Sequence, residues 1–273
     1  MIKVLIIGKN SFIGSNLFND FKNKVFTKKI SFYQFKSKKI KYIKNFTHII
    51  NCSINPEYIK NNYNNKFDVD LYIANKIKKF DIKYIFFSSR KIYQAKYNIK
   101  ENSKISPKCR YSKNKLITEK KLNDLINDKL LIFRVSNVIG MPRNKIKNKV
   151  HWTFLDDFFK FAKKGIIFDN SNSYKDFISI KKLSEVVLLC IKKNILGVYN
   201  LSIGKKIYLN KLVKWLNYYN KKKCRVINSN KYMGKSDNFT LNNLKLSKFI
   251  SLKYSINDLE KYCKKISKVY FRK

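Results

Sequence analysis

Short apolar runs alternate along this chain with longer stretches in which apolar residues recur every three or four positions. Runs of the first kind are typical of strands buried on both faces, and they span residues 3–7, 24–27, 48–52, 84–89 and 130–135. Helical spacing lies between them, for example at 67–80, where Val69, Ile73 and Ile77 form one stripe. This alternation predicts an α/β fold, a Rossmann-like doubly wound parallel sheet with helices on both faces.

A glycine turn follows the first predicted strand. Gly8 and Gly14 enclose it, and helical spacing begins at Ile13. This order is the setting of a dinucleotide-binding site, in which Gly8 permits the turn and Gly14 lets the helix pack closely. The first N–H groups of the helix, at Ser11, Phe12 and Ile13, would bind a pyrophosphate. Ser11 replaces the usual middle glycine and adds a Cβ near the phosphates. An ordinary strand–helix turn is the alternative, but the chain has only 7 Gly, which favours the binding site.

Small polar residues end several of the predicted strands. Ligands of such sheets bind beyond the carboxyl ends of the strands, and polar groups are costly to bury without partners. We therefore expect a cofactor to contact Asn51, Cys52 and Ser88 at this edge. Ser89 and Asn137 occupy similar positions on their own strands.

Tyr111 and Lys115 form a candidate acid–base pair. Residues four apart on a helix share one face, and an ammonium group close to a phenol favours the phenolate, which suits proton transfer at cellular pH. Spacing alone decides little in a chain with 18 Tyr, because it recurs at 72/76, 218/222 and 219/223. Tyr111 differs in its position, since it begins a helix directly downstream of the strand that ends at Ser89.

The basic composition first suggests nucleic acid or an anionic membrane as a partner, because the net charge is +44. Lys, Asn, Ile, Phe and Tyr are raised together, however, a skew typical of A/T-rich coding, and the lysines are spread along the chain. We therefore expect a solvated basic surface and no specific nucleic-acid partner. Five separated cysteines predict reduced thiols in a cytoplasmic protein without a metal site. No apolar run reaches the ~18 residues of a membrane span.

Five segments together resemble the extended short-chain dehydrogenases/reductases, in particular the nucleotide-sugar epimerases, dehydratases and reductases. They are the serine strand at 85–93, the Tyr-x-x-x-Lys segment at 107–115, and the stretches at 133–142, 175–178 and 197–201. The chain departs from the family pattern at Ser11, at Gln94, at Lys175 in place of arginine and at Lys182 in place of aspartate. These departures affect phosphate affinity and substrate identity more than the fold.

The resemblance implies a role for each candidate residue. Tyr111 would exchange a proton with a sugar oxygen, Lys115 would assist Tyr111 and hold the nicotinamide ribose, and Ser89 would hydrogen-bond the same sugar oxygen. Asn137 and Lys175 would contact the nucleotide and its phosphates. Lys175 has an alternative reading as one more surface lysine.

The resemblance also implies the domain organisation. A dinucleotide-binding domain would span residues 1–148, and 149–273 would form mainly a smaller C-terminal substrate-binding lobe. Within the latter, roughly 178–202 would return to the main sheet. The residues from His151 to Lys164 are expected to be helical.

The favoured activity is an NAD(P)-dependent 4-keto-sugar reductase, similar to dTDP-4-dehydrorhamnose reductase, acting on a nucleotide sugar. A 4-epimerase is the alternative. A 4,6-dehydratase is disfavoured, because it would carry an Asp-Glu pair where this chain has Arg90 and Lys91. A non-catalytic dinucleotide- or RNA-binding protein on the same scaffold also stays open, as does a homodimer.

For the cofactor we expect NADP, with NAD as the alternative. A site for NAD usually places an acidic residue about 20 positions after the glycine turn, but no acidic residue lies between Asp20 and Glu57. The second strand is expected to end at Thr27, Lys28 and Lys29, where a hydroxyl and two ammonium groups would suit a 2′-phosphate.

Overall fold

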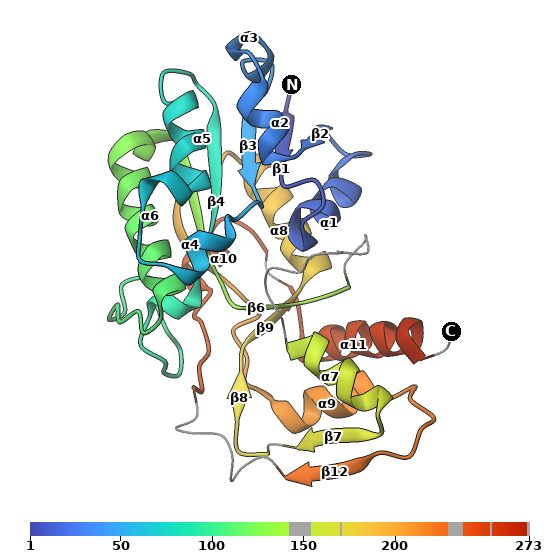
Figure 1. Cartoon of the computed structure of the whole chain (residues 1–273). Coiled ribbons are helices and arrows are strands. Elements are labelled where there is room, and N and C mark those ends of the chain that lie inside the picture. Colours follow the sequence, from blue (N-terminus) through green and yellow to red (C-terminus); the bar gives the residue numbers. More distant parts are fainter. Residues whose placement is uncertain (142–153, 170, 229–236, 252, 272–273) are drawn as a thin grey trace.

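A six-stranded, entirely parallel sheet forms the centre of the molecule (Figure 1). The structure is a computed structural model that describes residues 1–141, 154–169, 171–228, 237–251 and 253–271. The strand order is β10-β5-β4-β3-β1-β2. The bounds are β1 Lys3–Ile7, β2 Phe26–Ile30, β3 His48–Asn51, β4 Lys83–Ser89, β5 Leu130–Val135 and β10 Gly197–Leu201. The predicted doubly wound parallel sheet is confirmed.

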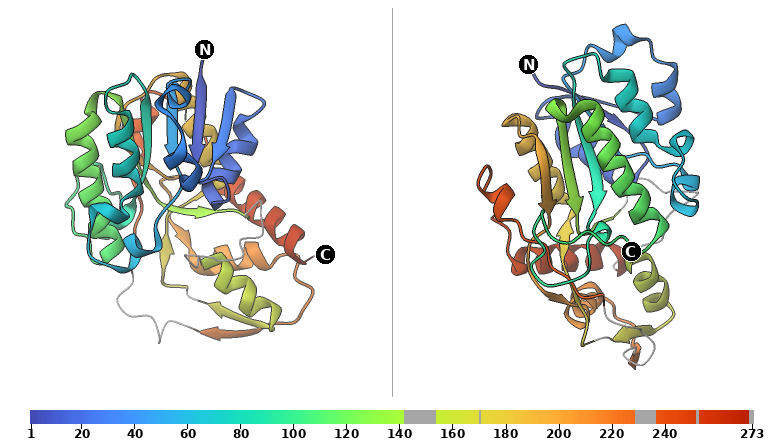
Figure 2. Two further views of the ribbon diagram at one scale, coloured as in Figure 1. Left: turned by 45° about the horizontal axis from the view of Figure 1, so that its top comes forward. Right: turned by 90° about the vertical axis from the view of Figure 1, so that its left-hand side faces the viewer.

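Helices cover both faces of this sheet, as two views of the ribbon show (Figure 2). On one face α1 (Phe12–Phe21) and α8 (Ile180–Lys192) pack against Val4, Ile6 and Phe133. On the other face the principal helices are α5 (Val69–Ile77) and α6 (Arg110–Ile126). Because successive strand residues point to opposite faces, one apolar run supplies both cores. This explains why the central strands read as continuous apolar runs.

Two short helices, α2 (Phe32–Ser37) and α3 (Ile40–Ile43), connect β2 to β3, and α4 (Pro56–Lys60) follows β3. In the described part of the chain no further strand pairs with the outer side of β2, which therefore forms one edge of the sheet. The sequence prediction placed this strand at 24–27, whereas it spans Phe26–Ile30. Ile30 is buried opposite Ile7 and extends the strand past two lysines.

A smaller region lies beyond the carboxyl ends of the main strands (Figure 1). Its short strands pair as β6 (Asn137–Ile139) with β9 (Phe177–Ser179), β7 (Ile166–Asp169) with β12 (Arg225–Asn228), and β8 (Tyr174–Lys175) with β11 (Ile207–Tyr208). Its helices are α7 (Phe154–Lys163), α9 (Leu209–Asn217) and α11 (Ile256–Phe271), and α10 (Leu244–Ser247) packs near β10. The expected helix from His151 is present from Phe154 onward, and its first three residues lie outside the described residues.

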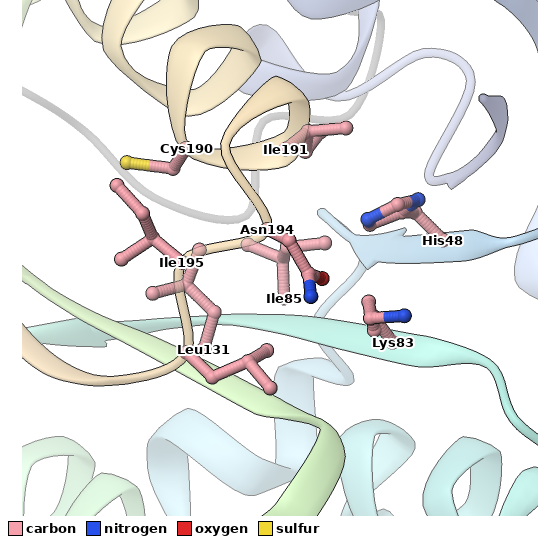
Figure 3. A pocket seen from close by; sticks show the side chains of 9 residues that line it. His48, Lys83, Ile85, Leu131, Cys190, Ile191, Asn194 and Ile195 are labelled. Carbon is pink, nitrogen blue, oxygen red and sulfur yellow. The ribbon is translucent and has the colours of Figure 1, made fainter.

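A small cavity of about 10 Å³ lies at the amino ends of the strands, between β3, β4 and the end of α8 (Figure 3). His48 and Lys83 line it, and burial followed by the charge of Lys83 lowers the pKa of His48 to about 4. The cavity has room for roughly one water molecule. It lies at the opposite end of the sheet from the predicted site and is too small for a sugar or a nucleotide.

Candidate active site

The glycine turn lies at the point where the strand order reverses. β1 is flanked by β2 and β3, so the crevice beyond their carboxyl ends is the expected ligand site of this topology. Gly8 has φ +103°, and a Cβ there would lie 2.8 Å from the carbonyl carbon of Cys52. A Cβ on Gly14 would lie 2.5 Å from the carbonyl oxygen of Gly8. Neither position accepts a side chain, so the backbone of the turn stays bare.

Ser11 caps the helix that follows this turn. Its hydroxyl accepts a hydrogen bond from the Gly14 N–H at 3.0 Å and donates one to the Gly8 carbonyl at 2.8 Å. The serine that replaces the usual glycine therefore stabilises the helix start. Phe12 and Ile13 occupy the first two helical positions, whose N–H groups have no partner within a helix and point out from its end. They suit a diphosphate.

Asn51 and Cys52 follow β3 beside this turn. The Asn51 amide donates to Asp70 Oδ1 at 2.8 Å and to the Ser53 carbonyl at 3.0 Å, and its oxygen accepts from the Ser53 N–H. Its polar atoms are thus engaged within the protein. Cys52 donates its N–H to the Ile7 carbonyl, and burial, with the charge of Asp70 next, raises the pKa of its thiol. Any polar contact that these two residues make with a cofactor would therefore come from their remaining backbone groups.

Ser88 and Ser89 behave differently at the end of β4. The Ser88 hydroxyl is buried and has no hydrogen-bond partner among the described residues, and the same holds for Ser136 after β5. Ser89 is half-buried, and its hydroxyl accepts from the Lys91 N–H at 3.2 Å, which starts a short 3₁₀ helix at Arg90–Ile92. Two buried hydroxyls without partners at this edge fit a site that a polar ligand completes.

Tyr111 and Lys115 lie on the first turns of α6, which packs against β4 and the 3₁₀ helix after it. Tyr111 is half-buried and Lys115 is buried. The Lys115 ammonium lies 4.3 Å from the centre of the Phe86 ring on β4 and 3.7 Å from Asp70 Oδ2. The Lys115 side chain therefore lies against β4, and Tyr111 lies one turn earlier on the same helix.

Asp70 is a site residue that the sequence prediction missed. Its carboxylate on α5 contacts Lys115, accepts hydrogen bonds from Asn51 and from the Tyr84 hydroxyl at 2.7 Å, and is buried. Burial raises its pKa, and the charge of Lys115 opposes that shift. The available signal was a carboxylate inside the apolar stripe of α5, three residues before Ile73.

The predicted substrate contacts lie together at the start of the smaller region. Asn137 donates its side-chain amide to the Asp176 carbonyl at 3.2 Å. Lys175, the neighbour of Asp176, lies with its ammonium 3.8 Å from Asp237 Oδ2. The Lys175 side chain is 25% exposed, and its ammonium lies beside Asp237.

The predicted 2′-phosphate residues do not form one group. Thr27, Lys28 and Lys29 lie within β2 rather than at its end. The Lys28 ammonium lies near the rings of Phe26 and Tyr42, whereas that of Lys29 lies 4.5 Å from the centre of the Phe18 ring on α1. Adjacent strand residues point to opposite faces, so at most one of the two lysines can reach a given ligand.

The sequence model of the NAD dependent epimerase/dehydratase family matches residues 4–202. The chain belongs to this family. The match spans the glycine turn, the serine strand, Tyr111 and Lys115, and it runs to the end of β10. It assigns the chain to an enzyme family whose members depend on a nicotinamide cofactor, in agreement with the resemblance of its motifs. A comparison with curated proteins found no match.

Solved structures with the same architecture include several members of the wider group. A UDP-N-acetylglucosamine 4-epimerase from Methanobrevibacter ruminantium, in complex with UDP-N-acetylmuramic acid, has a TM-score of 0.80 at 18% identity, over 99% of this chain and 98% of that one. A dTDP-4-dehydrorhamnose reductase from Clostridium acetobutylicum has 0.74 at 16%, over 96% and 98%. The Bordetella bronchiseptica enzyme WbmG, in complex with NAD and UDP, has 0.75 at 18%, over 98% and 93%. At these identities the likeness shows the fold.

The residues present fit a nicotinamide dinucleotide. The bare turn at Gly8 and Gly14 and the exposed helix start supply the diphosphate cradle, and the orphaned Ser88 hydroxyl lies at the same edge of the sheet. Within the described residues, no cluster of His, Cys, Asp and Glu could hold a metal ion, and no helix is long and apolar enough to cross a membrane.

Asp176 gives the fold a pH dependence. It is fully buried with Oδ2 on the Leu241 N–H at 2.9 Å, and burial raises its pKa to about 7. The folded protein therefore holds this proton more tightly than the unfolded chain, and stability falls as pH rises from about 4 to about 7. In urea unfolding across this range we expect Asp176→Asn to reduce that fall by up to roughly 4 kcal/mol. An unchanged pH profile would contradict this assignment.

Proposed function

We propose that this protein is an NAD(P)-dependent reductase of a 4-keto nucleotide sugar. The observation that carries the proposal is the packing of α6, whose first two turns carry Tyr111 and Lys115, against β4 and the 3₁₀ helix after Ser89, with the Lys115 ammonium over the Phe86 ring. The solved structures include enzymes that bind NAD and UDP or a UDP-sugar, which supports a nucleotide sugar as the substrate class.

The arrangement supports a simple division of roles. The nicotinamide, when bound, supplies a hydride to the sugar carbonyl carbon. Tyr111 donates a proton to the carbonyl oxygen as it gains charge, and the Ser89 hydroxyl donates a hydrogen bond to the same oxygen. Lys115 places a positive charge near the phenol and stabilises the phenolate that remains. Asp70 holds the Lys115 ammonium in this position, with Asn51 and Tyr84 fixing the carboxylate.

The test is to mix the protein with NADPH or NADH and a panel of 4-keto nucleotide sugars while following the nicotinamide absorbance. A reductase oxidises one reduced cofactor for each sugar converted. A 4-epimerase would instead interconvert 4-hydroxy sugars with no net change in absorbance. Binding of nucleotide sugar without turnover of any kind would favour a non-catalytic protein.

We further propose NADP as the preferred cofactor. The support is that β2 and the turn after it carry no carboxylate that would repel a 2′-phosphate, while Lys28 and Lys29 bring two ammonium groups. Because these lysines point to opposite faces, they form matched variants of equal charge. In fluorescence titrations we expect NADPH to bind more tightly than NADH. We also expect only one of the two variants, either Lys28→Ala or Lys29→Ala, to reduce the affinity for NADPH, by roughly tenfold. Tighter NADH binding by the unaltered protein would refute the preference.

A further inference from the structure

The segment 237–243, far along the chain, returns to the end of β4, and we call it the strap. It leads from the smaller region to α10 beside β10 (Figure 1). Asn238 binds the smaller region, since its side-chain oxygen accepts from the Tyr174 N–H at 3.0 Å. Thr240 binds the loop that follows β4, where its carbonyl accepts from the Ile99 N–H at 2.8 Å. The strap therefore bridges the two regions of the molecule.

Asp237, the first residue of the strap, holds Arg90 in a two-point ion pair. Arg90 Nη1 donates to Asp237 Oδ1 at 3.1 Å, and Nη2 donates to Oδ2. The Arg90 guanidinium also lies 3.9 Å from the centre of the Phe239 ring, and its side chain is 7% exposed. Burial raises the pKa of Asp237, but hydrogen bonds and charge from Arg90 outweigh it and lower the pKa overall. Two parallel charge-assisted hydrogen bonds fix a guanidinium in direction as well as in place, so the strap fixes Arg90.

Arg90 begins the 3₁₀ helix that follows Ser89. Its carbonyl accepts from the Tyr93 N–H at 3.1 Å, which closes the turn. The Lys91 N–H of the same turn donates to the Ser89 hydroxyl at 3.2 Å. An anchor on the Arg90 side chain therefore sets the position of the N–H that binds the serine.

The Lys91 N–H determines what the Ser89 hydroxyl can do. A hydroxyl that accepts an N–H keeps its own proton for another partner. Among the described residues, the Ser89 hydroxyl makes this one hydrogen bond, so its proton is free. Accepting one hydrogen bond also strengthens a hydroxyl as a donor. Donation to the sugar oxygen, the role that we assign to Ser89, depends on this orientation.

We propose that Asp237 is a positioning residue for Ser89 and acts through Arg90 and the 3₁₀ helix. This inference rests on the proposed function. The ion pair holds the turn, the turn holds the Lys91 N–H, and that N–H keeps the hydroxyl proton free for the sugar oxygen. Asp237 itself touches neither substrate nor cofactor in this assignment. The serine is ready to donate only while the strap is docked.

A double-mutant cycle with the sugar identified by the panel tests this link. Ser89→Ala is expected to lower kcat by about 10²-fold, the usual effect of losing one donor to a developing oxyanion. Asp237→Ala should lower kcat by about tenfold, because the hydroxyl is then correctly placed for only part of the time, and should change KM by no more than about twofold. In the Ser89→Ala background, Asp237→Ala should change kcat by about twofold or less, since the hydroxyl that it positions is gone.

Glu185 supplies a matched control. Like Asp237, it is a half-exposed carboxylate that pairs with a cation whose side chain is 7% exposed, in this case Lys182 on the same helix, α8. We expect Glu185→Ala to leave kcat unchanged in either background. Asp237→Asn keeps an acceptor for Arg90 and should lower kcat by a smaller factor. It replaces Asp237→Ala in the cycle if that variant does not fold.

Amide hydrogen exchange at Lys91 measures the same link without turnover. It is followed by NMR on the labelled full chain without ligand. Ser89→Ala gives the rate at which this amide exchanges once its acceptor is lost. We expect Asp237→Ala to raise the Lys91 exchange rate by about fivefold, toward that limit, and Glu185→Ala to leave it unchanged.

The outcomes separate this inference from the proposed function. An equal loss of kcat from Asp237→Ala with and without the Ser89 hydroxyl would show that Asp237 acts elsewhere, and the inference would be wrong. A normal kcat or an unchanged Lys91 exchange rate in Asp237→Ala would also overturn it. If the unaltered protein converts no 4-keto sugar, the proposed function fails, and the exchange rates then decide whether Asp237 positions Ser89.

Discussion

Replacing Tyr111 with Phe is expected to lower turnover by roughly 10²- to 10⁴-fold, the usual contribution of a general acid or base. The change removes the phenolic hydroxyl and keeps the ring, so the packing of α6 against β4 should persist. Lys115, whose ammonium is held by Asp70 and the Phe86 ring, should still be in place. Cofactor affinity should therefore change little. Steady-state kinetics with the sugar identified by the panel, together with a cofactor titration, measure both quantities.

Tyr72 supplies the matched control. It has a lysine four residues on, as Tyr111 does, but its ring is 40% exposed and packs on Phe32. Lys76 directs its ammonium to the backbone carbonyls of Phe35 and Lys36. We expect Tyr72→Phe to leave turnover unchanged. Near-normal turnover in Tyr111→Phe together with a loss in Tyr72→Phe would show that the wrong pair was chosen.

The central strands could be predicted from the sequence because each is buried on both faces and reads as one apolar run. The edge strand β2 could not be placed as well. It packs on one neighbour only, and its pattern of alternating exposure brings Lys28 and Lys29 into the strand. Lysines are common on exposed edge strands, but in the sequence alone two consecutive lysines suggest the end of a strand. The prediction therefore ended the strand too early and grouped two side chains that diverge.

Local motifs also carried much of the candidate site. Gly8, Ser11 and Gly14 lie within one turn, and Tyr111 and Lys115 lie within one helix, so spacing alone brings each set together. The assignments to Ser89, Asn137 and Lys175 remain predictions. Asp70 and Asp237 could not be found this way, because they meet Lys115 and Arg90 across 45 and 147 residues of chain. Such contacts depend on the whole sheet being assembled.

A second buried ion pair joins α6 to the sheet behind the site. Arg134 on β5 donates from Nη2 to Glu119 Oε2 at 2.7 Å and from Nε to both carboxylate oxygens. Its Nη1 donates to the Tyr93 hydroxyl and to the Glu101 carbonyl, both at 2.8 Å. Tyr93 in turn donates to Asn200 on β10. The Arg134 and Glu119 side chains are both less than a tenth exposed. Substitutions at this pair therefore measure how much a buried ion pair contributes to the stability of the fold.

Glu119→Ala is expected to reduce the free energy of unfolding by about 3–5 kcal/mol, because it leaves the Arg134 charge buried without its partner. Urea unfolding followed by circular dichroism measures this. Replacing both residues, Glu119→Leu with Arg134→Met, removes both charges and should recover most of the loss. The pair of Glu260 and Lys264 on α11, whose side chains are 30% and 33% exposed, is the control, and Glu260→Ala should cost about 1 kcal/mol or less. If Glu119→Ala lowered the free energy of unfolding no more than Glu260→Ala, water would have to reach the Arg134 guanidinium. The buried position of the Glu119–Arg134 pair would then be contradicted.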